Sequence, residues 1–443
     1  MARLTSALLL ASGLASGAAA QNQTQGEGLH SLMVAAGKLY FGTAMETNNF
    51  NDAAYQAIAS NKNEFGMFTP ENSQKWEVTE PTQNKFSFTQ ADSIAEKVQS
   101  NGQLFRCHTL TWHSQLPSFG KPALPTSTLI TSLPNPQKPV RNGTWTPETL
   151  TAVLTAHITT VMQHYAGQCY AWDVVNEALN EDGTLRPSVF LTTLGPSYIP
   201  LSFTIASQAD PSAKLYYNDF NLETTPSKTA GALALARTIL AAGAPLHGIG
   251  FQAHLTVGQT PPRNTLATIL AQFAALGLEV AYTELDIAHA APALPADAAA
   301  NARQADDYVA VVGSCLDVSA CVGVTVWQFT DRYSWVPGTF PGKGEACLWT
   351  EGMRPKVAYE GVVRLLRGAV GGGGGNSSRG GGGGGGNGNG NGRVSPNRTN
   401  GVGESAASGR PVFTAPPGFN GAATVWGGLV GLVWPAVAAL VLL

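Results

Sequence analysis

Eight short runs of β-branched and aromatic residues alternate with longer segments rich in Ala and Leu between Leu39 and Phe329. The short runs are predicted strands, over residues 39–44, 66–69, 104–108, 170–176, 214–218, 248–253, 280–284 and 322–328. The longer segments, such as 149–165, 228–242 and 265–276, space Leu, Ile and Ala as helices do. Near-continuous apolar strands are expected when both faces of a parallel sheet are covered. This alternation predicts an α/β fold, the closed (β/α)8 TIM barrel.

A glycine-rich segment limits the ordered part of the chain to one domain. Between Gly371 and Gly392, fifteen of 22 residues are Gly, and most of the others are Asn or Ser. Such a segment has no apolar side chains whose burial could offset the entropy of ordering a glycine backbone. We therefore predict a disordered linker over 368–421 and a single barrel domain over 29–367.

The first twenty residues have the pattern of a secretory signal peptide. Arg3 supplies a positive charge, Ala7–Leu14 an apolar stretch, and Ala18–Ala20 a small-residue cleavage site before Gln21. The apolar stretch is too short to span a bilayer as a helix. We predict that residues 1–20 are a signal peptide, and the alternative is an N-terminal helix of the fold.

The C-terminal tail has the pattern of a second targeting signal. Residues 422–443 are apolar almost throughout, and no charged residue follows Arg410. A transmembrane anchor normally carries basic residues on its cytoplasmic flank, so we predict a glycosylphosphatidylinositol attachment signal that is removed. Attachment at Ser405 leaves a spacer before the apolar tail, whereas attachment near Asn420 leaves almost none. A genuine tail-anchored helix is the alternative.

Other features of the sequence are consistent with secretion. Four Asn-x-Ser/Thr sequons, at Asn22, Asn142, Asn376 and Asn397, are predicted glycosylation sites. We expect a monomer at the cell surface, attached to the plasma membrane or the cell wall through the lipid anchor. The net charge of −3 gives no reason to expect a nucleic-acid partner.

The mature chain retains all five cysteines. Cys315 and Cys321 are six residues apart, close enough to form a disulfide across a small loop in an oxidising compartment. Cys107, Cys169 and Cys347 leave at least one thiol over, and their pairing stays open. Because the sequence has no CxxC pair and no clustered histidines, we predict no metal site and no cofactor.

Polar and aromatic side chains gather at or just past the C-terminal ends of the predicted strands. They are His108, Asn176, Glu177, Asn218, Asp219, Gln252, His254, Glu284, Asp286 and Trp327. Barrel enzymes build their active sites at this end of the barrel. Any one of these residues alone could equally be a surface loop residue, but the same placement on so many strands predicts a site there.

Two glutamates end apolar, β-branched strands. Glu177 ends the segment WDVVNE, and Glu284 lies in YTELD. A carboxylate at such a position is costly unless it is exposed in a cleft or has a partner. A single strand-end glutamate is more often a salt-bridge partner. Two that converge across a barrel mouth suit glycoside hydrolysis, in which one protonates the leaving oxygen and the other attacks or activates water.

Seven segments resemble family 10 of the glycoside hydrolases. They are ENSQKW at 71–76, HTLTWHSQLP at 108–117, WDVVNEAL at 172–179, YNDFNLE at 217–223, GIGFQAHL at 248–255, TELD at 283–286 and TVWQFTDRYSWVPG at 325–338. These motifs span the predicted domain in the family's order. The resemblance implies a (β/α)8 barrel, retaining stereochemistry and mainly endo-1,4-β-xylanase activity, with xylan as the polysaccharide partner.

The resemblance also implies a role for each matching residue. Glu177 matches the acid/base and Glu284 the nucleophile, while His254 and Asp286 match the pair that orients the nucleophile. The substrate-binding positions are matched by Glu71, Asn72, Lys75, His108, Trp112, Asn176, Gln252, Trp327 and Trp335. Hydrogen bonds from His113, Gln115 and Asn218 are expected to support these residues, and Trp172 is expected in the core.

The implied mechanism is a double displacement. Ionised Glu284 forms a covalent glycosyl-enzyme, and the negative charge of Glu284 keeps Glu177 protonated for the first step. Once Glu284 is esterified, Glu177 can act as a base towards water. Retention requires the two carboxyl groups to lie about 5–5.5 Å apart.

Four positions depart from the family's motifs. Cys107 stands where Gly is usual, Phe251 replaces a small residue, Phe220 replaces Tyr, and Gln328 replaces a common Gly. We expect Gln328 to add bulk near the central sugar. The Pro-rich stretch 120–143 is expected to extend one wall of the cleft.

Two other functions are alternatives. The first is another retaining β-1,4-glycanase, acting on cellulose or mixed-linkage glucan, because the sequence does not measure how crowded the sugar site is. The second is a non-catalytic, wall-bound carbohydrate-binding protein, whose signature would be the loss of Glu177 or Glu284. Both glutamates are present.

Overall fold

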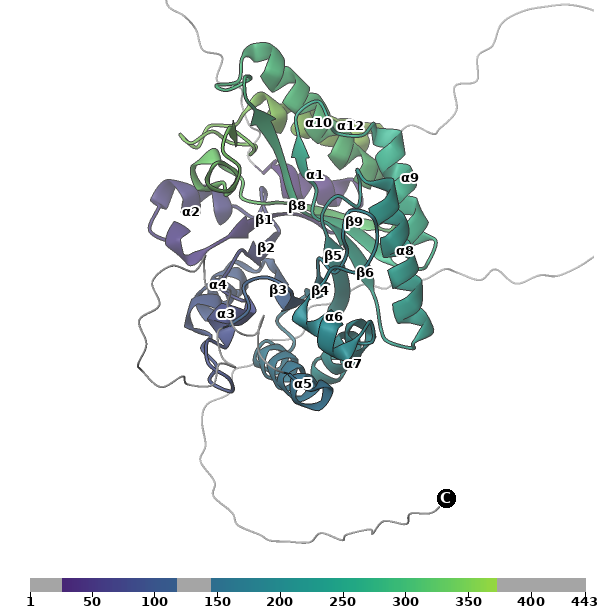
Figure 1. Cartoon of the computed structure of the whole chain (residues 1–443). Helices are drawn as coiled ribbons and strands as arrows, with labels where there is room; N and C mark the ends of the chain where they lie inside the picture. Colours follow the sequence, from purple (N-terminus) through teal and green to yellow (C-terminus); the bar gives the residue numbers. More distant parts are fainter. Residues whose placement is uncertain (1–25, 118–144, 373–443) are drawn as a thin grey trace, which may run out of the picture. The chain divides into compact units, whose positions relative to one another are not determined.

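The structure, a computed structural model, describes residues 26–117 and 145–372. In this part of the chain, eight parallel strands close into a barrel with helices on its outside (Figure 1). The ring consists of β1 (Tyr40–Met45), β2 (Met67–Pro70), β3 (Leu104–Trp112), β4 (Ala171–Asn176), β5 (Lys214–Asp219), β6 (Gly248–Phe251), β8 (Glu279–Ala290) and β9 (Cys321–Val326). Pairing of β9 with both β1 and β8 closes the ring. The predicted (β/α)8 fold is confirmed.

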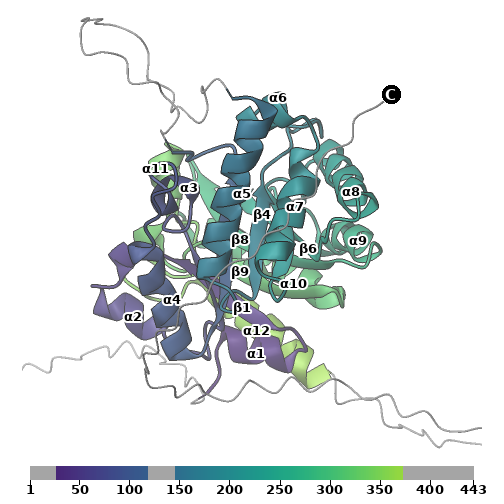
Figure 2. The same ribbon diagram turned by 90° about the horizontal axis from the view of Figure 1, so that it is seen from below.

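Helices cover the outside of the ring (Figures 1 and 2). They are α1 (Leu29–Ala35), α2 (Ala53–Ala59), α3 (Trp76–Thr79), α4 (Thr89–Asn101), α5 (Pro147–His164), α6 (Val189–Leu194), α7 (Tyr198–Ala209), α8 (Pro226–Ala241), α9 (Arg263–Ala274), α10 (Ala298–Asp317), α11 (Val336–Thr339) and α12 (Val357–Gly372). Helix α5 shows why such a segment is helical. Thr146 caps its first turn, Pro147 occupies the first helical position, and Leu150, Leu154 and Ile158 bury one face.

Two strands run further than the sequence predicts. Strand β3 continues past His108 to Trp112, and β8 continues past Glu284 to Ala290. The extension of β8 pairs in parallel with β7 (His254–Thr256) and antiparallel with β10 (Lys343–Gly344). These two short strands lie outside the closed ring and satisfy backbone groups beyond it. The segments around His254 and Glu284 are therefore held by backbone hydrogen bonds.

The inside of the barrel contains a buried ion pair. Arg106 of β3 and Asp173 of β4 are both fully buried and pair with each other. The Arg106 guanidinium also lies 4.5 Å from the ring centre of Tyr216 on β5. An unpaired charge at this position would be very costly, so the two side chains depend on each other.

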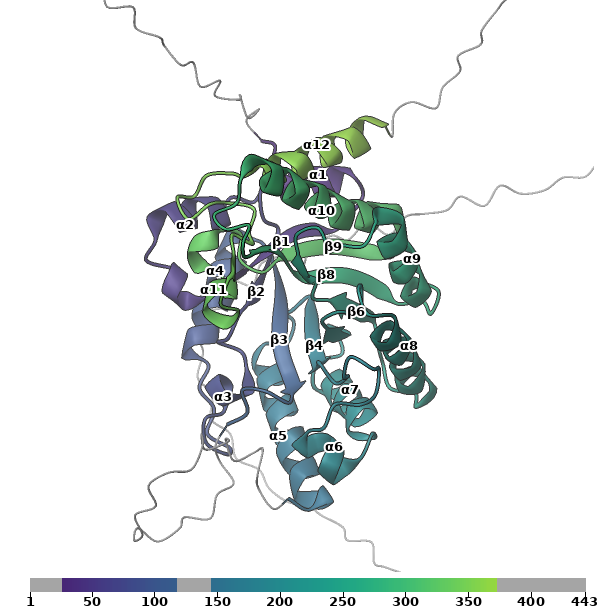
Figure 3. The same cartoon turned by 45° about the horizontal axis from the view of Figure 1, so that its top comes forward.

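The first and last helices of the described chain lie side by side (Figures 2 and 3). Arg367 of α12 pairs with Glu27, just before α1, at 2.8 Å. The hydroxyl of Tyr359 on α12 donates to Glu64 at 2.9 Å. Helix α12 runs on to Gly372, beyond the predicted domain end at residue 367.

The cysteines of the barrel form two disulfides. One joins Cys315 to Cys321, and the other joins Cys107 to Cys169. Cys347 is buried and free. The Cys107 departure thus supplies half of a cross-link between β3 and the segment before β4, a pairing that the sequence left open.

Several predictions concern residues that the structure does not describe. They are the signal peptide, the sequons at Asn22, Asn142, Asn376 and Asn397, the stretch 120–143, the glycine-rich linker and the apolar tail. Among the helices of residues 26–117 and 145–372, none is long and apolar enough to cross a membrane.

Candidate active site

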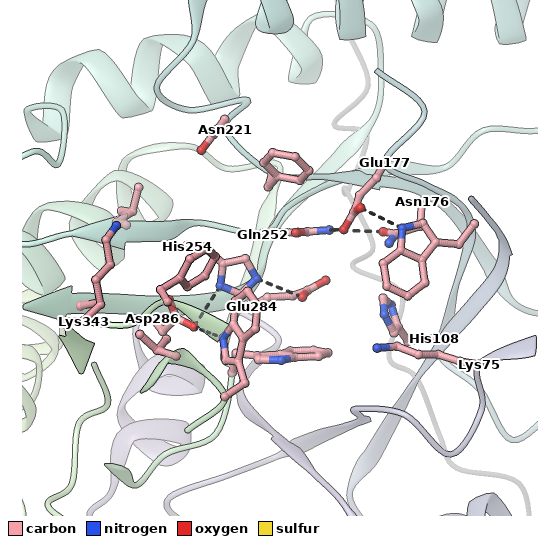
Figure 4. A pocket seen from close by; sticks show the side chains of 18 residues that line it. Lys75, His108, Asn176, Glu177, Asn221, Gln252, His254, Glu284, Asp286 and Lys343 are labelled. Carbon is pink, nitrogen blue, oxygen red and sulfur yellow. Dashed lines mark hydrogen bonds and ion pairs between the residues drawn. The ribbon is translucent and has the colours of Figure 1, made fainter. Parts of the chain in front are cut away.

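A pocket of about 540 Å³ opens at the C-terminal ends of the strands (Figure 4). Its walls include eleven of the predicted site residues: Lys75, His108, Trp112, Asn176, Glu177, Gln252, His254, Glu284, Asp286, Trp327 and Trp335. Glu71 and Asn72 are not among the lining residues. Side chains from β3, β4, β8 and the segments after β2, β6 and β9 are therefore brought together in one cavity, as the strand-end pattern predicts.

Glu284 lies in β8 with both carboxylate oxygens bonded. Asn218 of β5 donates to Oε1 at 2.8 Å, and His254 Nε2 lies 3.3 Å from Oε2. Burial acts to raise the pKa of this carboxyl. The hydrogen bond from His254 and the electrostatic effects of His108 and His254 outweigh burial, so the pKa of Glu284 lies below its usual value. Glu284 is therefore ionised at neutral pH.

His254 bridges two carboxylates. Its Nδ1 lies 2.9 Å from Asp286 Oδ2, and the indole nitrogen of Trp335 donates to the same oxygen at 2.7 Å. Burial acts to lower the pKa of His254, but Asp286 and Glu284 together raise it to about 10. The imidazolium then donates from both ring nitrogens and fixes the orientation of the Glu284 carboxylate (Figure 4).

We expect His254→Asn to destabilise the protein in a pH-dependent way. The pKa of His254 is raised in the folded state, so its contribution is complete below the unfolded value, about 6.5, and is lost as pH rises through about 10. Chemical denaturation at pH 6 should show the variant less stable by on the order of 2–4 kcal/mol, and the gap should shrink by pH 9.5.

A surface histidine provides the control for this comparison. His164 pairs with Asp92 at 2.7 Å, and about a third of its side chain is exposed. His164→Asn should cost less than about 1 kcal/mol. A gap for His254→Asn that stays constant from pH 6 to 9.5 would contradict the assigned charge.

Glu177 follows β4 and faces the pocket from the opposite side. Trp112 Nε1 donates to its Oε2 at 2.8 Å, and Gln252 Nε2 donates to its Oε1 at 3.1 Å. Its backbone has φ 56°, a left-handed conformation that a non-glycine residue adopts at a cost of about 1 kcal/mol. The backbone nitrogen donates to Asn218, and Arg186 Nε donates to the Glu177 carbonyl at 3.1 Å. These bonds hold the turn that directs the carboxylate into the pocket.

Asn218 lies between the two glutamates. Its side-chain nitrogen, which donates to Glu284, also lies 2.9 Å from the Asn176 amide. The Thr283 hydroxyl donates to Oδ1 of the Asn218 side chain at 2.6 Å. The amide of Asn218 is thereby fixed, and it couples the position of Asn176 to that of Glu284.

His108 is held from beneath the pocket by the barrel's ion pair. Its Nδ1 lies 2.9 Å from Asp173 Oδ2, and its backbone nitrogen donates to Gln74 at 3.0 Å. The His108 ring meets Trp327 edge-on, with 5.6 Å between ring centres. Asp173 was not predicted as a site residue, although a charged residue inside an apolar strand was a signal that it has a buried partner.

The segment after β2 contributes Lys75 to the pocket. Its ammonium lies 4.8 Å from the ring centre of Trp112 and donates to Asn72 at 3.0 Å. Gln115 also donates to Asn72, at 3.4 Å. Burial lowers the pKa of Lys75, although Glu284 and Glu71 oppose that shift. Burial raises the pKa of Glu71 to about 7.

The structure explains three of the departures. Phe220 lines the pocket, with Lys228 3.4 Å from its ring centre. Phe251 packs away from the pocket against Phe273 of α9. Gln328 does not line the pocket, so the expectation that it adds bulk near the sugar is wrong.

The buried Gln328 side chain is bonded elsewhere. It accepts from the Tyr55 hydroxyl at 2.9 Å and donates to Asn49 at 3.1 Å. Its φ of 67° is a left-handed conformation that glycine adopts most readily.

Sequence reasoning missed part of the pocket wall. The missed lining residues are Asn221, Leu255, Ala288, Val336, Phe340 and Lys343. Most lie on the extension of β8 or on segments that pack against it, where no strand was predicted. Within residues 26–117 and 145–372, no cluster of His, Cys, Asp or Glu suits a metal ion.

The chain is similar to known proteins over most of its length. The model of glycosyl hydrolase family 10 matches residues 28–365. Endo-1,4-beta-xylanase 5 of Pyricularia oryzae is 51% identical over 378 residues, covering 83% of this chain and 88% of the relative.

Two solved structures extend the likeness to the fold. Endo-1,4-beta-xylanase XylE of Penicillium canescens is 37% identical with a TM-score of 0.70, and the match covers 77% of this chain and 98% of that one. Xylanase 10B of Thermotoga petrophila in complex with xylobiose is 33% identical, also at a TM-score of 0.70, covering 78% and 99%.

Proposed function

Because the chain belongs to glycosyl hydrolase family 10, we propose that Glu284 and Glu177 carry out its reaction as nucleophile and acid/base. The activity is that of an endo-1,4-β-xylanase, which hydrolyses internal 1,4-β-xylosidic bonds of xylan. The observation that supports the assignment is the contrast between the two carboxylates. Glu284 is bonded to an imidazolium that stabilises its negative charge, whereas Glu177 accepts from the neutral side chains of Trp112 and Gln252.

In the first step, ionised Glu284 attacks the anomeric carbon of the sugar and the glycosidic C–O bond breaks. Glu177 gives its proton to the leaving oxygen, so the departing chain leaves as an alcohol. His254 donates to an oxygen of Glu284 and keeps the carboxyl group in one orientation during the attack.

In the second step, water attacks the same carbon and the bond to Glu284 breaks. Glu177, now a carboxylate, removes a proton from that water and regains its acid form. The negative charge of Glu284 returns beside the His254 imidazolium, which stabilises the leaving carboxylate.

Aromatic and amide groups of the pocket suit a neutral sugar chain. Trp327 and Trp335 present apolar ring surface to the C–H faces of the xylose rings. Asn176, Gln252, His108 and Lys75 offer hydrogen-bond partners for the hydroxyl groups. Glu71 and Asn72 lie outside this pocket, and their proposed role is to bind the neighbouring sugar together with Lys75, whose ammonium donates to Asn72. No cofactor takes part in this scheme.

The anomeric configuration of the first product tests the mechanism. Attack by Glu284 followed by attack of water inverts the carbon twice, so the released sugar should keep the β configuration. Proton NMR of xylohexaose hydrolysis within the first minutes, before mutarotation, should show the β anomer in excess. An initial α anomer would contradict the proposal. A parallel assay on carboxymethyl-cellulose should give slow hydrolysis, because the similar proteins are xylanases.

We also propose that the protein is a secreted monomer held at the cell surface by a glycosylphosphatidylinositol anchor attached near Ser405. The apolar tail without a basic flank supports the anchor. Phosphatidylinositol-specific phospholipase C should release the enzyme from intact cells into the medium. Activity that remains with the cells after phospholipase treatment would indicate a tail-anchored helix instead.

A further inference from the structure

A row of side chains leads from the nucleophile to the edge of the pocket. The His254 ring, bonded to Glu284, lies 4.9 Å from the ring centre of Trp335. Trp335 lies 5.3 Å from Phe340, and the ammonium of Lys343 lies 5.6 Å from the ring centre of Phe340. Lys343 therefore lies beyond His254 and Asp286, on the side of the pocket opposite Lys75 and His108 (Figure 4).

Phe340 and Lys343 are available to a ligand. Phe340 lines the pocket and is 43% exposed, which places it among the most exposed large apolar residues of the described chain. The Lys343 ammonium donates to the Thr256 hydroxyl at 3.1 Å. Within residues 26–117 and 145–372, no carboxylate lies within ion-pair distance of Lys343, whereas Lys214 and Lys356 each pair with one and Lys228 pairs with two.

The backbone that carries these two side chains is held by hydrogen bonds. Lys343 lies on β10, in register with Ala290 of β8, and its backbone nitrogen donates to the Phe340 carbonyl at 3.0 Å. The backbone nitrogen of Ala291 donates to Gly342 at 2.8 Å. A cation and an exposed ring thus extend from an ordered backbone at one end of the pocket before any ligand binds, which reduces the entropy cost of binding.

We propose that Phe340 and Lys343 form a subsite for a uronic-acid branch on the xylan chain. The inference rests on the proposed function and narrows its substrate class. A neutral xylose backbone offers a lysine only hydroxyl groups. A carboxylate on a branch sugar offers a charge-assisted hydrogen bond, and the exposed Phe340 ring offers a surface for the C–H face of that sugar.

Three related polymers separate the effect of the lysine–carboxylate bond from that of the Phe340 ring. They are unbranched xylan, glucuronoxylan, and the same glucuronoxylan after chemical reduction of its carboxyl groups. Lys343→Met keeps the apolar stem and removes the charge. It should lower kcat/KM on glucuronoxylan about three- to tenfold relative to any change on the other two polymers. Phe340→Ala should lower kcat/KM on both branched polymers by a larger factor than on unbranched xylan.

Salt dependence tests whether Lys343 acts through its charge, and a surface lysine serves as the control. The advantage of wild type over Lys343→Met on glucuronoxylan should decline between 50 mM and 500 mM NaCl, since salt screens a partly exposed charge pair. Lys62→Met, at an exposed lysine outside the pocket, should behave as wild type. An equal loss for Lys62→Met would mean general attraction of an anionic polymer and would overturn the subsite.

Activity of the variants and of the wild-type protein on the three polymers tests the subsite and the proposed function separately. If Lys343→Met changes all three polymers equally, or none, the carboxylate is not recognised and the subsite is wrong. If Phe340→Ala lowers kcat/KM on unbranched xylan as much as on the branched polymers, Phe340 acts on the backbone chain and the branch assignment is wrong. If wild-type protein does not hydrolyse unbranched xylan, the proposed function itself fails.

Discussion

Glu284→Gln is expected to reduce xylan hydrolysis to below about one per cent of the wild-type rate, because a neutral amide does not replace a carboxylate as nucleophile. The side chain keeps its size, so the pocket should still bind xylan. Initial rates by reducing-sugar release and binding of xylohexaose by calorimetry would measure the two effects separately. The expected pattern is a loss in kcat with an affinity within a few-fold of wild type.

Two controls make this result specific. Glu96→Gln removes a carboxylate from the exposed face of α4, outside the pocket, and should leave both rate and affinity unchanged. Thermal unfolding of Glu284→Gln should show a cooperative transition, which separates lost chemistry from lost folding. Residual activity above about one per cent in a folded variant would indicate a different nucleophile.

Glu177→Ala is expected to slow xylan hydrolysis by about 10²- to 10⁴-fold, the contribution of general acid–base catalysis. The loss should depend on the leaving group. An aryl xylobioside whose phenol leaves without protonation should still form the glycosyl-enzyme, so a burst of phenol should precede a slow steady state. Azide fits the space left by the carboxylate and needs no general base, so added azide should restore turnover.

The anomeric configuration of the azide product tests whether Glu284 forms a covalent intermediate. Double displacement through Glu284 predicts a β-xylobiosyl azide, because azide replaces water in the second step. An α azide would mean that azide attacks the substrate directly and that Glu284 forms no covalent intermediate. Azide should not rescue Glu284→Gln in the same way, since that variant retains the acid and lacks the nucleophile.

Much of the fold follows from local patterns. All eight predicted strands coincide with strands of the ring, because β-branched apolar runs between helical segments are strong signals. The extensions of β3 and β8, and the strands β7 and β10, were missed. Their pairing joins segments such as 254–256 and 286–288 that are far apart in the sequence, and no local pattern shows such partners.

The site was predicted where chemistry and strand position coincide. Glu177, Glu284, His254 and Asp286 are polar residues at the ends of apolar strands, and the structure places all four in one pocket. Lys343 was missed because a lysine in a Pro- and Gly-rich segment is usually a surface residue. Gln328 was misplaced because its left-handed backbone, which turns its side chain towards Tyr55 and Asn49, is a property of the folded chain.

The sequence by itself predicted the barrel and the two strand-end glutamates Glu177 and Glu284, since hydrophobic periodicity and residue chemistry are local properties. Only the tertiary structure decided the surroundings of each carboxylate. The Asp173–His108 contact, the link from Asn218 to both Asn176 and Glu284, and the imidazolium of His254 between two carboxylates all join different strands. Burial and neighbouring charge set protonation, and both arise only when the ring of strands closes.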